Sequence, residues 1–192
     1  MVRTGIYGGT FNPIHRGHTT LGSLLVEQGF VDELWFMVSP QNPLKASHDV
    51  LPRAYPTDEQ RLHMARLAVG EDETGRLRVS DFEFHLPRPS YTIHTLQALR
   101  ETYPDRQLHL VIGADNWEHF HQWYHSDEIL RDYPLIVLPR PGYSFQQPHL
   151  QSLPTLPISS THIREQIRKG DYDGRDLHPA VWHEIQTHRY YL

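Results

Sequence analysis

Two histidines follow a pair of glycines in the segment GGTFNPIHRGH, which covers residues 8–18. The glycines let the backbone approach a phosphate closely, and the start of a following helix offers unpaired N–H groups and a positive dipole to an anion. His15 and His18 are three residues apart, so both imidazoles can face one anion if a helix begins near Gly17. A neutral imidazole donates a hydrogen bond and a protonated one adds positive charge, which suits phosphoryl oxygens that gain charge. The segment predicts a site for nucleotide phosphates; the alternative is a glycine turn beside two surface histidines.

A second predicted helix start carries hydroxyls and an arginine, in the segment ISSTHIR at residues 158–164. Ser160 lies at the start of this helix and Arg164 lies one turn inside it. By the same dipole argument, the segment predicts a second anion site. The alternative is an ordinary N-cap with a solvated arginine.

The elements that position these groups alternate between strands and helices. Strands are predicted at residues 3–7, 33–38, 77–84, 108–112 and 135–138, and helices at 19–28, 61–69, 90–103, 126–131, 159–169 and 180–187, with a capping box at 57–60 and irregular segments at 40–56 and 139–151. This alternation predicts an α/β fold with a Rossmann-like, doubly wound parallel sheet in a single domain, residues 1–192. The ligand is expected at the carboxyl ends of the strands, where the segments that follow residues 7, 38 and 112 converge.

Composition narrows the classes of partner. A length of 192 residues fits one domain, and the absence of cysteine excludes disulfides and thiolate metal sites. A net charge of −5 argues against a general nucleic-acid-binding surface, so we expect small-molecule partners. The fifteen histidines are scattered, and we assign no residue as a metal ligand. No leader and no apolar stretch long enough for a bilayer are recognised, so we expect a cytoplasmic monomer or homo-oligomer with no membrane partner.

The two anion motifs together resemble those of the HxGH nucleotidyltransferase superfamily, and GGTFNPIHRGH is similar to the form found in bacterial-type nicotinate mononucleotide adenylyltransferases. The resemblance extends from residue 8 to residue 164. It implies the nucleotidyltransferase fold and transfer of adenylate from ATP, accompanied by Mg²⁺, to nicotinate mononucleotide in NAD biosynthesis. The catalytic residues that it implies are His15 and His18. The ATP-binding residues that it implies are Gly8, Gly9, Thr10, Phe11, His15, His18, Gly113, Asp115, Ser160 and Arg164.

Further segments imply where the mononucleotide binds. The segment SYTIHTL at residues 90–96 is similar to a family segment that contacts the pyridine carboxylate, and a helix N-terminus is a suitable receptor for a carboxylate. Taken alone, it also fits a capped helix that packs Ile93 and Leu96 inward. Trp123 resembles the family tryptophan that stacks on the pyridine ring, with Trp117 as its rival. The mononucleotide-binding residues implied are Lys45, Tyr91, Thr92, Trp123, Tyr124 and Arg140.

Three residues depart from the family pattern. Asn12 replaces a commoner aspartate, which argues against a direct metal role there; Leu44 replaces a histidine, and His94 an acidic residue. One alternative is a sister enzyme that uses nicotinamide mononucleotide or phosphopantetheine. Another is a non-catalytic nucleotide-binding module, which would be expected to lack His15, His18 or Arg164.

Overall fold

The computed structural model describes residues 1–40, 55–70, 74–143 and 152–192. Within these ranges five strands form one sheet in the order β3-β2-β1-β4-β5, and every neighbouring pair is parallel. The strands are β1 (Val2–Gly9), β2 (Glu33–Val38), β3 (Leu77–Ser80), β4 (Arg106–Gly113) and β5 (Leu135–Leu138). The chain builds outward from β1 to β3 and then returns to place β4 on the other side of β1. The predicted doubly wound parallel sheet in a single α/β domain is therefore confirmed.

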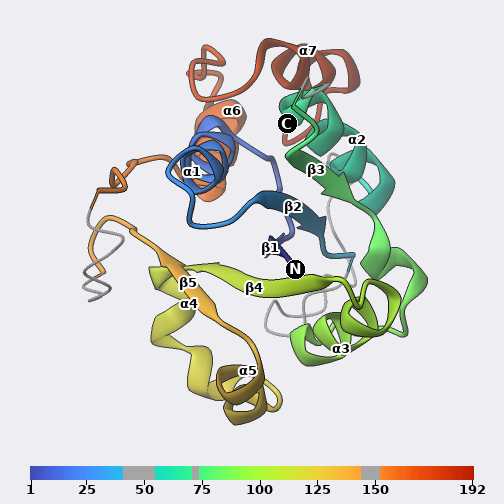
Figure 1. Cartoon of the computed structure of the whole chain (residues 1–192). Coiled ribbons are helices and arrows are strands. Elements are labelled where there is room, and N and C mark those ends of the chain that lie inside the picture. The colour runs from blue at the N-terminus through green and yellow to red at the C-terminus, as the bar shows by residue number, and fades with distance from the viewer. Residues whose placement is uncertain (41–54, 71–73, 144–151) are drawn as a thin grey trace.

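Helices cover both faces of the sheet (Figure 1). One layer consists of α1 (Arg16–Glu27), α2 (Asp58–Val69), α6 (Ser160–Lys169) and α7 (Pro179–His188), and the other of α3 (Thr92–Thr102), α4 (Ala114–Glu118) and α5 (Ser126–Asp132). Side chains that alternate along β1 point to opposite layers, so Tyr7 packs with the first and Ile6 with the second. All six residues of β2 are buried, as expected for a parallel strand that is covered on both faces.

The strand predicted at residues 77–84 is shorter in the structure, where β3 ends at Ser80. The Oγ of Ser80 accepts a hydrogen bond from the backbone N–H of Phe82 (3.2 Å), and the N–H of Phe84 donates to the carbonyl of Asp81 (2.8 Å). These local bonds compete with the sheet ladder. The chain therefore leaves the sheet and forms the 3₁₀ turn η1 (Phe82–His85).

Other boundaries differ by a few residues. Helix α1 begins at Arg16 instead of residue 19, and the capping box predicted at residues 57–60 is formed by Thr57 and Gln60. The short helix α4 and the 3₁₀ turn η2 (Phe120–Gln122) follow β4 where no separate helix was predicted. None of the helices described is both long and apolar enough to cross a membrane.

The ends of β1, β2 and β4 meet at one edge of the sheet. Gly8 and Gly9 at the end of β1, Ser39 after β2 and Ile112 in β4 line the same cavity, whose volume is about 410 Å³. This arrangement confirms the predicted convergence of the segments that follow these strands. Most of the predicted loop at 40–56, with Lys45 and Leu44, lies outside the described residues.

Candidate active site

His15 caps helix α1, and His18 lies in its first turn. Their rings stack, with 3.6 Å between the ring centroids and 24° between the ring planes. The backbone N–H of His15 donates to Nδ1 of His18 (3.2 Å), so the ring proton of a neutral His18 is on Nε2. A Cβ atom at Gly17 would lie 3.0 Å from the His15 ring. The HxGH spacing therefore stacks two imidazoles at a helix N-terminus, and the glycine between them leaves room for the ring.

The His15 side chain is uncharged at neutral pH. The residue is only 2% exposed, and this burial lowers its pKa to about 3, with the nearby Arg140 guanidinium as a second cause. The sequence left open whether a neutral or a protonated imidazole serves at this position. The structure favours the neutral ring for His15.

Residues 8–18, which we call the phosphate turn, are held by side chains from distant elements. Arg61 of α2 donates to the carbonyl of Thr10, Arg164 of α6 donates to the carbonyl of Asn12 (2.7 Å), and Ser160 Oγ donates to the carbonyl of Pro13 (2.9 Å). The structure thus brings the two predicted anion motifs together, since α6 starts against the turn that carries the histidines.

Phe11, a further predicted ATP-binding residue, packs inside the phosphate turn. It is 3% exposed and has a positive φ of 44°, a conformation that few residues other than glycine adopt. Its ring meets the edge of the His18 ring at 5.1 Å between centroids and 88° between planes. Phe11 therefore supports the orientation of His18 from inside the protein.

Asp115 and Arg140 lie together beside Gly113, at the end of β4. The Oδ1 of Asp115 is 3.5 Å from Nε of Arg140, within the range of an ion pair. A Cβ atom at Gly113 would lie 2.3 Å from that oxygen and 3.0 Å from that nitrogen, so the pair requires glycine here. Arg140 was predicted to bind the mononucleotide, yet it lies beside Asp115, which was predicted to bind ATP. It is also close enough to His15 to lower the pKa of that imidazole. Its contact with either substrate stays a prediction.

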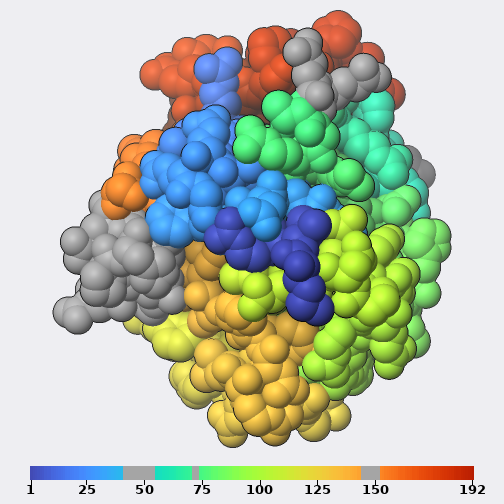
Figure 2. All heavy atoms as spheres, viewed as in Figure 1, coloured from blue at the N-terminus to red at the C-terminus, as the bar shows by residue number. Residues whose placement is uncertain are grey.

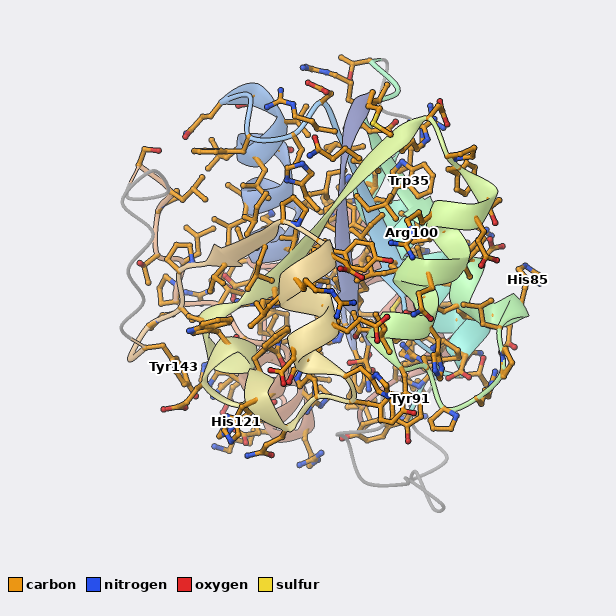
Figure 3. All side chains as sticks on the ribbon, turned by 60° about the horizontal axis from the view of Figure 1, so that its bottom comes forward. Trp35, His85, Tyr91, Arg100, His121 and Tyr143 are labelled. Atoms are coloured by element: carbon orange, nitrogen blue, oxygen red, sulfur yellow. The ribbon has the colours of Figure 1, made fainter. Side chains whose placement is uncertain are left out.

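The cavity brings together four of the six residues predicted to bind the mononucleotide. They are Tyr91, Thr92, Trp123 and Tyr124, and Gly8, Gly9 and Thr10 from the phosphate turn line it with them. Tyr91 precedes α3, and its ring lies 4.8 Å from that of Tyr124. In Figure 3, Tyr91 lies in the lower part of the view.

The two candidate stacking tryptophans have different surroundings. Trp123 lines the cavity, and its buried Nε1 has no hydrogen-bond partner in the part of the chain that the structure describes. Trp117 is absent from the cavity lining and stacks on Phe120, with 5.4 Å between centroids and 27° between planes. These positions favour Trp123 as the residue that contacts a ring in the cavity.

A buried carboxylate that sequence reasoning missed also lines the cavity. Glu83 is 5% exposed; its Oε2 accepts from Ser39 Oγ (2.6 Å) and its Oε1 accepts from Thr95 Oγ1 (2.8 Å). Burial raises the pKa of Glu83, and the neighbouring hydroxyls oppose that rise. Because Ser39 follows β2 and Thr95 lies in α3, Glu83 joins two walls of the cavity. Its sequence signal is an acid between two phenylalanines in the strand predicted at residues 77–84.

Arg61 is the second residue that sequence reasoning missed. It is 5% exposed, donates to the carbonyls of Thr10 and Ser39 (3.0 Å to the latter), and pairs with Asp58 at 2.8 Å. Its signal is an arginine next to Leu62 at the start of the helix predicted at residues 61–69. Arg61 therefore ties the phosphate turn to the end of β2.

Comparison with known proteins identifies the family. The profile of the cytidylyltransferase-like family matches residues 6–166. A protein of Bacteroides thetaiotaomicron named probable nicotinate-nucleotide adenylyltransferase is 45% identical over 193 residues, covering 97% of this chain and 92% of its own. A protein of the same name from Bacteroides fragilis is 47% identical over 189 residues, covering 95% and 90%.

A solved structure shares the fold. The nicotinic acid mononucleotide adenylyltransferase of Plasmodium falciparum, complexed with NaAD, superposes with a TM-score of 0.78 at 18% identity, covering 100% of this chain and 98% of the other. At that identity the similarity shows the fold alone. With the family profile and the Bacteroides relatives, the chain belongs to the cytidylyltransferase-like family and, within it, to the nicotinate-nucleotide adenylyltransferases.

Proposed function

We propose that this protein transfers the adenylyl group of ATP to nicotinate mononucleotide, giving nicotinate adenine dinucleotide and pyrophosphate in NAD biosynthesis. The observation that carries the proposal is the contact between the cavity and the phosphate turn at residues 8–10. An acceptor whose ring occupies the cavity can thus present its phosphate to a nucleotide on the turn. The names of the Bacteroides relatives support the same reaction.

The chemistry requires positioning and charge stabilisation. A phosphate oxygen of the mononucleotide attacks the α-phosphorus of ATP, and the bond from that phosphorus to the oxygen of the leaving pyrophosphate breaks. Since no protein nucleophile takes part, the residues act by holding the two phosphates in line and by donating to oxygens that gain charge. We assign these donor roles to His18 through Nε2–H, to neutral His15, and to Arg164 with the N-terminus of α6.

Mg²⁺ enters in this scheme as the counterion of ATP, where it neutralises the triphosphate oxygens. Among the described residues, no group of three or more His, Cys, Asp or Glu side chains is placed to hold a metal ion. Asp115, which the family resemblance places near the nucleotide, lies beside Arg140. We treat MgATP as the substrate.

The cavity should prefer the acid form of the pyridine ring to the amide form. Thr92 is the first residue of α3, so a ligand carboxylate there meets unpaired N–H groups and the positive end of the helix dipole. The amide would direct its own NH₂ group at one of these donors, which costs roughly 1–3 kcal/mol. We expect a preference for the acid of at least about tenfold in kcat/KM.

One assay tests the proposal. The purified protein is given MgATP with nicotinate mononucleotide, nicotinamide mononucleotide or phosphopantetheine, and pyrophosphate release is measured, with His18→Ala as the blank. We expect rapid release with the first acceptor, slower release with the second and none with the third. Equal use of the two mononucleotides would refute the carboxylate site but not adenylyl transfer, whereas no release with either would refute the function. A cytoplasmic location, the oligomeric state and the lack of nucleic-acid binding remain expectations.

A further inference from the structure

Tyr191, which follows α7, reaches the phosphate turn from the far end of the chain. Its hydroxyl donates to Oδ1 of Asn12 at 2.6 Å, across 179 positions of sequence. The residue is 1% exposed, and its ring packs edge-on against Tyr55 at 5.4 Å between centroids. Figure 2 shows the C-terminal residues, in red, packed against the blue and teal residues of the N-terminal half.

The bond between Tyr191 and Asn12 has a fixed direction. Burial raises the pKa of the Tyr191 hydroxyl well above its usual range, although the guanidinium groups of Arg164 and Arg61 oppose that rise. The hydroxyl therefore keeps its proton at every physiological pH, and it donates that proton to Oδ1 of Asn12, which can only accept. Because Oδ1 accepts this proton, the amide of Asn12 is held in one orientation, with its NH₂ group turned away from Tyr191.

Asn12 is held at a second point by a proposed ATP-binding residue. Its backbone carbonyl accepts from Nη1 of Arg164 at 2.7 Å, so Tyr191 and Arg164 act on the side chain and the backbone of the same residue. The next carbonyl, that of Pro13, accepts from Ser160. His15 lies two positions after Pro13, so the backbone conformation at residues 12 and 13 sets the position of the His15 imidazole.

The geometry points to Tyr191 as a positioning residue for ATP: through Asn12 it fixes the phosphate turn in the conformation that receives the triphosphate. This inference rests on the proposed function, because it assumes that the phosphate turn binds ATP. Tyr191 itself touches no substrate in this scheme. Its effect should therefore fall on ATP affinity and turnover and leave acceptor affinity unchanged.

Tyr191→Phe tests this role with a matched control next to it. The substitution keeps the ring and removes only the donor. Tyr190 is also buried, but its hydroxyl has no hydrogen-bond partner among the described residues, so Tyr190→Phe removes a hydroxyl without cutting a contact. Both variants are compared for urea midpoint, ATP affinity by calorimetry without acceptor, and kcat and KM for each substrate.

We expect Tyr191→Phe to lower kcat/KM for ATP at least about tenfold, since small displacements at a phosphoryl-transfer site are costly. Its KM for the mononucleotide and all values for Tyr190→Phe should stay within about twofold of wild type. In an Asn12→Ala background, Tyr191→Phe should have little further effect, because the partner is already absent.

Two results would overturn the inference. One is a folded Tyr191→Phe enzyme with normal ATP affinity and turnover, which would make the bond purely structural. The other is an equal loss in the Asn12→Ala background, which would show that Tyr191 acts by another route. Failure of the proposed function is recognised separately, because ATP affinity is measured without acceptor and the wild-type protein alone decides whether pyrophosphate is released.

Discussion

The phosphate turn and the cavity are adjacent, yet they are built differently. The carbonyls of Thr10, Asn12 and Pro13 all accept bonds from distant side chains, and His15 is almost fully buried. The cavity is open space of about 410 Å³; Tyr124 on its lining is half exposed, and the Nε1 of Trp123 has no partner among the described residues. One region is assembled before substrate arrives, and the other retains groups that a ligand can satisfy.

This difference suggests a division of labour. Groups that stabilise a transition state contribute most when their positions are fixed in advance, because no reorganisation is needed during the reaction. Groups that select an acceptor can instead gain their partners on binding. We therefore expect substitutions in the phosphate turn to lower turnover and substitutions in the cavity to raise the acceptor KM.

The largest effect is expected for His18→Ala. Loss of a preorganised donor at a phosphoryl group should lower kcat by about 100- to 1,000-fold, with little change in affinity for the mononucleotide. His183→Ala, an exposed histidine on α7, serves as the control and should retain wild-type kinetics. Near-normal turnover of the His18 variant would mean that the stacked histidines are structural, and the comparison would fail.

Trp123→Ala tests the cavity side. Loss of the stacking face should raise KM for both mononucleotides about tenfold to a hundredfold, because an aromatic stack on a base contributes roughly 1–3 kcal/mol. The KM for ATP should not change. The matched variant is Trp117→Ala, which removes an indole that stacks on Phe120 outside the cavity lining and should leave acceptor KM nearly unchanged. The reverse result would assign ring stacking to Trp117.

The buried state of His15 predicts a pH dependence of stability. The pKa of His15 is about 3 in the folded protein and 6.5 in the unfolded chain. Below pH 6.5 the unfolded chain therefore binds one more proton, and stability decreases as the pH is lowered. The cost approaches about 1.4 kcal/mol per pH unit well below pH 6.5 and is half of that at pH 6.5, so between pH 6.5 and pH 5 wild type should lose about 1.6 kcal/mol more than His15→Gln. Urea unfolding at both pH values measures this difference. An equal loss of stability in wild type and His15→Gln would show that His15 is not held neutral in the folded protein.

The smallest effect is expected for Glu83→Gln. Glutamine keeps the shape and one acceptor oxygen, and the hydroxyls of Ser39 and Thr95 can rotate to accept from its NH₂ group. We expect a few-fold change in KM for the mononucleotide, equal to less than about 1 kcal/mol, and none for ATP. Steady-state kinetics on both substrates provides the measurement. A large loss of kcat instead would show that Glu83 contributes to catalysis together with the phosphate turn and not only to acceptor binding.

Local motifs explain why much of this site could be predicted from the sequence. The stacked histidines depend on residues 15–18 and a helix start, and Ser160 with Arg164 likewise lies on one helical turn, so neighbouring residues encode each arrangement. The order of strands and helices similarly predicted the sheet and the edge at which the segments meet.

The residues that were missed act over long sequence separations. Arg61 reaches the carbonyl of Thr10 across 51 positions, and Ser39 reaches Glu83 across 44. Such contacts depend on how α2 and η1 pack against the sheet, which no local pattern records. The end of β3 was also misplaced, because a single hydroxyl at Ser80 competes with the ladder.

The long reach of the contacts around the phosphate turn has a consequence for folding. The carbonyls of Asn12 and Pro13 and the side chain of Asn12 receive hydrogen bonds from residues 147 to 179 positions away. Contacts of such separation form slowly because a large loop must close first. A chain in which the sheet has formed but α6 and Tyr191 have not docked would contain regular secondary structure without a complete phosphate turn. Catalytic competence should therefore return after the circular dichroism signal during refolding, so that activity reports completion of the native state more strictly than helix content does.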